Sequence, residues 1–168
     1  MNSQDLRELQ APLKNKYKEH PETALVTLRA SGKLGDNITC TVKTSHGMIT
    51  AGLHPATGGD GNDICSGDML LEALAACAGV TLNAVATAIG IEVKSGLISA
   101  EGEIDFRGTL GVSKDAPVGF KSIHLHFTLT SDAPPEKIDS LLKLTERYCV
   151  VYQTLLKGVE ISVSHEVN

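Results

Sequence analysis

The sequence predicts an α+β fold, and three observations support this prediction. Stretches typical of strands come in groups separated by helices, without the strict alternation of a parallel α/β protein. One long apolar helix, predicted at 67–89, divides these groups. The chain has 168 residues, of which 42% are hydrophobic and 21% charged, so it can form one domain with a substantial core.

The N-terminal residues are predicted to form a helix over 3–19. Ser3 is its expected N-cap, and Pro12 is expected to kink or split it. We therefore divide the chain into an N-terminal helical extension, 1–20, and a single domain, 21–168.

Alternating side chains predict an antiparallel meander after this extension. Residues Ser45-His46-Gly47 form the expected turn between its last two strands, and a Gly-rich surface loop follows at 54–67. This loop lacks the Lys-Ser/Thr ending of a phosphate-binding loop, which argues against a nucleotide site. The three predicted strands are 24–30, 38–44 and 48–53.

The helix at 67–89 is expected to be the central one, buried on most sides and ended by Gly90. Although it is apolar, polar residues interrupt it and Ala is more frequent than Leu, which argues against a membrane span. The interrupting residues are Asp68, Glu72 and Asn83.

The C-terminal half is predicted to contain two long strands, a helix and a final strand. His124 and His126 share one face of the second strand, where we expect exposed side chains rather than a metal site. The helix starts at Pro134-Pro135 and either ends near Tyr148 or continues to Lys157. The three strands are expected at 91–106, 121–130 and 159–167.

Charge and cysteine content exclude several classes of protein. The net charge is −5 and there is no long basic patch, so nucleic acid is not an expected partner. No apolar segment follows Met1, so we expect a cytoplasmic protein without a signal peptide. No two of the four cysteines form a C-x-x-C motif, and we expect neither a metal nor a cofactor.

Cys77 lies on a helix face of small residues, which allows another element to approach closely. By itself a cysteine in the middle of a helix is usually core packing, and the same holds for Cys149. The small-residue face contains Ala73, Val80, Thr81, Ala84 and Ala88.

The surroundings of both cysteines resemble those in the OsmC/Ohr family. Its first motif is similar to residues 66–77, SGDMLLEALAAC, in which a polar start leads into an Ala- and Leu-rich helix with a cysteine. Its second cysteine segment is similar to residues 146–155, ERYCVVYQTL. The order of elements agrees over about residues 24–167.

This resemblance implies an intertwined homodimer that reduces small organic hydroperoxides. Carried over to this chain, Cys77 is the peroxidatic cysteine and Cys149 the resolving cysteine. The Cys77 thiolate would become a sulfenic acid, Cys149 would condense with it to a disulfide, and a dithiol, lipoyl in parts of the family, would reduce that disulfide.

The resemblance also implies an arginine paired with a carboxylate beside the reactive thiol. Arg29 is the nearest match, and Asp68 is the nearest carboxylate, although the family's Asn-Pro-Glu is replaced here by Cys65-Ser66-Gly67. We expect that a helix N-terminus cannot stabilise the Cys77 thiolate, because the dipole effect fades within the first turn of a helix, and that a cation is supplied from elsewhere.

The leading interpretation is a cysteine-based peroxidase with Leu70, Leu74 and Tyr152 lining its substrate site. The main alternative is a dimeric protein that binds a small apolar molecule and whose cysteines are inert. A metal-binding thiol protein is a third hypothesis.

Overall fold

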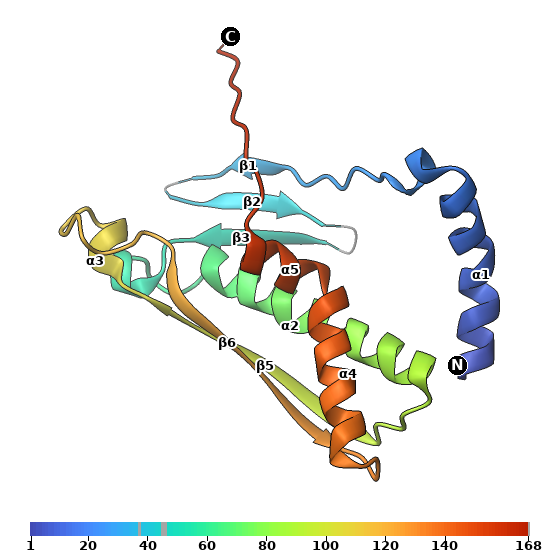
Figure 1. Ribbon diagram of the computed structural model, residues 1–168. Helices are drawn as coiled ribbons and strands as arrows, with labels where there is room; N and C mark the ends of the chain where they lie inside the picture. The colour runs from blue at the N-terminus through green and yellow to red at the C-terminus, as the bar shows by residue number, and fades with distance from the viewer. Residues whose placement is uncertain (37, 45–46, 168) are drawn as a thin grey trace.

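The computed structural model describes residues 1–36, 38–44 and 47–167, and it confirms the α+β fold. A long helix, α2, crosses the middle of the molecule between a mixed sheet and a two-stranded sheet (Figure 1). The mixed sheet has the order β1-β2-β3-β4, with bounds Gly32–Leu34, Cys40–Lys43, Met48–Gly52 and Ile64–Cys65. The second sheet pairs β5, Ser95–Ile104, with β6, Phe120–Thr130.

The N-terminal helix, α1, spans Ser3–Glu19 as predicted. Its N-cap is Asn2 rather than Ser3, because the Asn2 side chain accepts from the backbone of Asp5 while the Asp5 carboxylate accepts from the Asn2 N–H. The expected split is wrong, since the helix runs through Pro12. No residue of α1 is buried, and its first turn meets α2 where Ser3 Oγ donates to the Ala88 carbonyl at 3.4 Å.

The strand predicted at 24–30 is wrong. A 3-10 turn, η1, occupies Pro21–Ala24, and residues 25–30 then run toward β1 without a strand partner. Leu25 and Leu28 are 84% and 88% exposed, so the apolar side chains that suggested a strand have nothing to pack against within one chain.

The next two predicted strands are confirmed as the antiparallel pair β2 and β3, in which Thr41 lies opposite Thr50. Ser45 and His46 of the predicted turn lie outside the described residues. The predicted loop holds a 3-10 turn, η2, at Pro55–Thr57 and the short strand β4, which pairs parallel with β3. A Cβ on Gly59 would lie 1.8 Å from the Leu53 carbonyl oxygen, so the glycines allow tight backbone packing.

The helix α2 spans Ser66–Ile89, one residue longer than predicted, and ends at Gly90 with a left-handed φ of 70°. It is long and apolar enough to cross a membrane, but one of its faces packs against α4, α5 and β5 and forms part of the core. The expected burial on most sides is wrong for a single chain, since Ala73, Val80 and Ala84 are exposed. The buried row consists of Leu74, Ala78, Leu82 and Ala86.

The two long strands predicted in the C-terminal half are present as β5 and β6, which pair as an antiparallel hairpin joined by a loop that contains the one-turn helix α3, Phe106–Thr109. His124 and His126 lie exposed on its outer face with ring centroids 6.0 Å apart. Within the described ranges no three His, Cys, Asp or Glu side chains are grouped as metal ligands.

The C-terminal helix is divided into α4, Pro135–Tyr148, and α5, Val150–Lys157. Leu141 of α4 packs with Leu82, Ala86 and Ile91 in the core. The final strand predicted at 159–167 is wrong, because this segment leaves the body of the molecule without a strand partner (Figure 1).

Candidate active site

Cys77 is half-buried near the middle of α2, on the side of the helix that meets α5. The periodicity of α2 places its large side chains in the core and leaves small side chains around Cys77. As a result, the N-terminus of α5 approaches the sulfur closely, and Cys149 lies there.

Cys149 forms the junction between α4 and α5 and is only 1% exposed. Its backbone is extended, with φ −71° and ψ 110°, so the two helices do not run on as one. Its N–H closes α4 on Thr145, its carbonyl accepts the first hydrogen bond of α5 from Gln153, and the Gln153 side chain donates back to the Glu146 carbonyl at 2.8 Å. The break therefore has a fixed geometry.

The surroundings of Cys77 favour its thiolate. Burial by itself raises the pKa of Cys77, but hydrogen bonds from the Val151 N–H, the Cys149 thiol, the Val150 N–H and the Thr81 side chain outweigh it and hold the pKa below its usual value. The expectation that no helix N-terminus could help was wrong, because it considered only α2. The N-terminus that faces Cys77 is that of α5.

The pKa of Cys149 is shifted in the opposite direction. Burial raises its pKa, the Tyr152 N–H lowers it, and the negative Cys77 sulfur that accepts its proton raises it again, so that the pKa of Cys149 lies above its usual value. The two pKa shifts thus favour Cys77 as the sulfur that loses its proton first, with the Cys149 thiol as its hydrogen-bond donor. Both cysteines are free in the structure.

The structure does not bring the other two predicted site residues to Cys77. Arg29 lies in the exposed segment before β1, and within the described part of the chain no ion pair or hydrogen bond joins it to Cys77. Asp68 is exposed in the first turn of α2, where it lines a separate cavity of about 320 Å³ together with His54 and Cys65.

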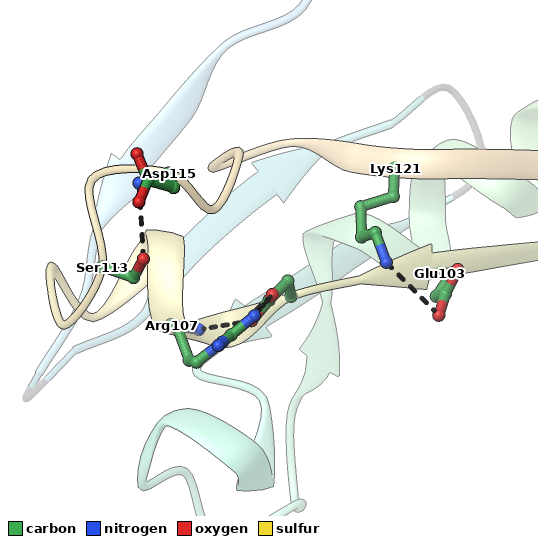
Figure 2. Close-up of polar contacts among 6 residues, drawn as sticks. Glu103, Arg107, Ser113, Asp115 and Lys121 are labelled. Atoms are coloured by element: carbon green, nitrogen blue, oxygen red, sulfur yellow. Dashed lines mark hydrogen bonds and ion pairs between the residues drawn. The ribbon is translucent and has the colours of Figure 1, made fainter.

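Two other arginines contact side chains other than those of Cys77 and Cys149. Arg107 Nε donates to Asp105 Oδ1 at 2.9 Å. Figure 2 shows the Arg107 side chain with its polar contact as a dashed line. These hydrogen bonds lower the pKa of Asp105 to about 2. Arg147 lies over the ring of Tyr148, with Cζ 5.4 Å from its centroid.

A cavity of about 460 Å³ lies between β6 and α5, and neither Cys77 nor Cys149 is among the residues that line it. Leu74, three residues before Cys77, and Tyr152, three residues after Cys149, line this cavity, whereas Leu70 does not. Lys121 and Glu146 add polar groups. The other lining residues are Phe120, Ser122, Ile123, Leu125, Phe127, Leu155 and Leu156.

Sequence reasoning missed two parts of this site. The backbone N–H groups at the start of α5 carry no side-chain signal. Thr81 stood out only as a small residue, although its position four residues after Cys77 places it one turn away on the same face.

Comparisons with known proteins agree with this architecture. A sequence profile described as OsmC-like protein matches residues 59–164, a range that includes both cysteines. A search of curated proteins gave no match.

Among solved structures, an OsmC-like protein from Mycoplasma pneumoniae is similar, with 21% identity and a TM-score of 0.67 over 79% of this chain and 89% of that one. An organic hydroperoxide resistance protein from Elizabethkingia anophelis has 17% identity and a TM-score of 0.63 over 81% and 92%. An organic hydroperoxide resistance protein OsmC from Legionella pneumophila has 20% identity and a TM-score of 0.60 over 80% and 91%. These similarities establish the shared fold, and with the profile match over most of the chain they show that the protein belongs to the OsmC-like family.

Proposed function

We propose that this protein is a thiol-dependent peroxidase that reduces organic hydroperoxides with Cys77 and Cys149 and thereby protects the cell against oxidative stress. The observation that carries the proposal is the hydrogen-bonded pair itself, in which the Cys77 sulfur is stabilised as a thiolate and Cys149 is held beside it as a thiol. Two of the similar structures are named organic hydroperoxide resistance proteins, which supports the same assignment.

The first step breaks the O–O bond. The Cys77 thiolate attacks the terminal hydroperoxide oxygen, two electrons pass from sulfur to the peroxide, and the departing alkoxide takes up a proton to become an alcohol. Cys77 is left as a sulfenic acid. The cavity lined by Leu74 and Tyr152 suits the apolar part of such a substrate.

The second step forms a disulfide. Cys149 attacks the sulfenic sulfur, the S–S bond replaces the S–O bond, and the sulfenic hydroxyl leaves as water after it takes up the Cys149 proton. An external dithiol, with lipoyl as one candidate, then reduces the disulfide and is itself oxidised. No metal or cofactor takes part.

We further propose that the working form is a cytoplasmic homodimer. The exposed face of α2 around Val80 and the unpaired segments 25–30 and 159–167 leave much apolar surface uncovered in one chain. Arg29 lies in one of these segments, so a second copy is the route by which it would reach Cys77. Asp68 would then act by orienting that guanidinium.

A second candidate function is the binding of a small apolar molecule, with both cysteines inert. The cavity of about 460 Å³ favours it, because its size is in the range of ligand pockets. In that case the thiol pair would be a packing feature.

Treatment with cumene hydroperoxide followed by intact-mass spectrometry separates the two functions. A peroxidase forms a Cys77–Cys149 disulfide and consumes peroxide in the presence of a dithiol, whereas a binding protein does neither.

Cys77→Ser should abolish peroxide consumption, because a hydroxyl cannot form the sulfenic acid. Cys40→Ser, a half-buried thiol on β2, is the matched control and should retain it, as should Cys65→Ser. If Cys65→Ser lost peroxide consumption as completely as Cys77→Ser, the assignment of Cys77 and Cys149 as the reactive pair would be overturned.

A further inference from the structure

Phe120, the first residue of β6, lines two cavities. One is the cavity of about 460 Å³ between β6 and α5. The other is the cavity of about 320 Å³ at the start of α2, which Cys65 and Asp68 also line. In the part of the chain that the structure describes, no other residue lines both cavities. The Phe120 side chain is therefore the place where the two cavities meet.

A β-bulge turns Phe120 toward these cavities. Ile104 of β5 pairs with Phe120. The preceding residue, Glu103, pairs with Ser122, so the register passes over Lys121, the extra residue of the bulge. In a regular strand Phe120 would share the exposed face of Ser122, because side chains two residues apart point to the same side. The extra residue reverses this alternation, and Phe120 is half-buried.

An ion pair crosses the hairpin at the bulge. Lys121 Nζ lies 3.7 Å from Glu103 Oε1 (Figure 2). Lys121 lines the larger cavity and Glu103 lines the smaller one, so the ion pair also crosses the boundary between them. This boundary therefore consists of an exposed ion pair and the half-buried ring of Phe120.

Two glycines let the Phe120 ring lie close to the backbone. A Cβ on Gly102 of β5 would lie 2.3 Å from Phe120 Cε1, which is too close for any side chain at that position. At the tip of the ring, a Cβ on Gly67 of α2 would lie 3.6 Å from Phe120 Cζ. The ring therefore reaches from β5 to the first turn of α2 and fills the space between these two elements.

We propose that the Phe120 ring is a partition that closes the larger cavity at its border with the smaller one and thereby limits the length of the alkyl chain that the larger cavity accepts. This inference rests on the proposed function, because it takes the ligand to be the alkyl chain of an organic hydroperoxide. The larger cavity is lined mainly by aliphatic and aromatic side chains, which suit such a chain.

The smaller cavity offers further apolar contacts, because Leu71, Ile104 and Phe106 line it. An alkyl chain that stops at the Phe120 ring cannot make these contacts. Phe120 is therefore a specificity-determining residue, which separates short hydroperoxides from long ones without touching the cysteines.

The test is the binding of linear primary alcohols, which are the products of linear alkyl hydroperoxides. The full-length wild type, Phe120→Ala and Phe106→Ala are dialysed to equilibrium against hexanol, octanol, decanol or dodecanol. The alcohol concentrations on the two sides of the dialysis membrane give the dissociation constant. Phe106→Ala is the matched control, because Phe106 lines only the smaller cavity and its truncation retains the Phe120 ring.

In the wild type, each methylene that fits should improve the affinity about fourfold, and this gain should stop once the chain reaches the Phe120 ring. Phe120→Ala should extend the gain by about two methylenes, so that its preference for dodecanol over hexanol exceeds that of the wild type by about tenfold. Phe106→Ala should keep the wild-type limit. If Phe120→Ala does not fold by circular dichroism, Phe120→Leu takes its place, with a smaller extension in the same direction.

Three results would overturn the inference. The first is a wild type that binds no alcohol, and the second is a wild-type affinity that rises without a limit through dodecanol. The third is a chain-length limit that Phe120→Ala leaves unchanged, or that Phe106→Ala moves as far.

Consumption of cumene hydroperoxide is measured on the same samples, so that the two proposals can fail separately. A wild type that consumes no peroxide, while its chain-length limit moves in Phe120→Ala, would reject the peroxidase function and retain the partition. A wild type that consumes peroxide, with a limit that Phe120→Ala does not move, would reject the partition and retain the peroxidase function.

Discussion

At the scale of single residues, the Cys77 sulfur lies where four hydrogen-bond donors meet, two from the backbone and two from side chains. Burial works against the thiolate, and these donors outweigh it. The arrangement is asymmetric, because the pKa of Cys77 is lowered while that of Cys149 is raised. In the proposed mechanism, Cys77 is therefore the sulfur that attacks, and Cys149 keeps its own proton until the sulfenic acid has formed.

Cys149→Ser separates the two roles of the pair. A serine hydroxyl can still donate to Cys77, so the first reaction with cumene hydroperoxide should proceed once. Turnover with a dithiol should be lost, and excess peroxide should carry Cys77 on to sulfinic and sulfonic acid, because no thiol traps the sulfenic acid. Intact-mass spectrometry over a time course follows each product, with the wild type as the control that stops mostly at the disulfide. A Cys77 thiol that stays unreacted in this variant would reject the two-cysteine mechanism.

Arg29 provides a second test at this scale. If a second copy brings its guanidinium to the site, Arg29→Ala should raise the pKa of Cys77 and slow the first step, by about tenfold if the pKa rises by about one. Arg7→Ala, another exposed arginine in the N-terminal region, is the control. Stopped-flow measurement of sulfenic acid formation gives the rate. An unchanged rate would mean that the donors of one chain are sufficient.

At the scale of elements, the break between α4 and α5 creates the site. An unbroken helix would leave the N–H groups of Val150 and Val151 bonded within the helix, where they could not reach a sulfur. The extended backbone of Cys149 ends α4 and makes this residue the N-cap of α5. The Cys149 thiol and the N–H donors thus come from the same few residues.

Val150→Pro tests the backbone donor directly. Val150 is the first residue of α5, is 69% exposed and follows an extended residue, so proline fits the helix start there. The substitution removes one N–H from Cys77 and should raise its pKa by up to about one, so that alkylation of Cys77 by iodoacetamide begins at higher pH. Val150→Ala keeps the N–H and should titrate like the wild type. A Val150→Pro protein with an unchanged midpoint and intact helix content would contradict the role of this N–H.

The sequence was sufficient for elements whose signal is local. Apolar periodicity and Gly90 located α2 to within one residue, and alternation located β2, β3 and the β5–β6 hairpin. The strand predictions at 24–30 and 159–167 were wrong. Alternation shows that a segment is able to pair as a strand, but it does not show that a partner strand exists in the same chain. The break at Cys149 carries no Gly or Pro, so the cysteine pair was expected only from the family resemblance and the α5 donors were not expected.

At the scale of the whole molecule, the uncovered apolar surface is concentrated in a few places. Leu25, Leu28, Ile161 and Val163 are between 82% and 92% exposed in segments without a strand partner, and Val80 is 72% exposed on α2. Unpaired strand-forming segments beside a small-residue helix face are the surface that a second copy would cover. Cys77 precedes Val80 by three residues on α2, so assembly and chemistry would be linked.

The last prediction is that the protein is a homodimer held together through this face. Sedimentation at micromolar concentration should give about twice 17.7 kDa for the wild type. Val80→Glu should shift it toward monomer, because a buried unpaired carboxylate is costly, and should also slow peroxide consumption if Arg29 comes from the second copy. Val112→Glu is the matched control, since Val112 is equally exposed, at 73%, but lies in the loop after α3. A wild type that sediments as a monomer, or a Val112→Glu protein that dissociates as readily as Val80→Glu, would contradict an interface on α2.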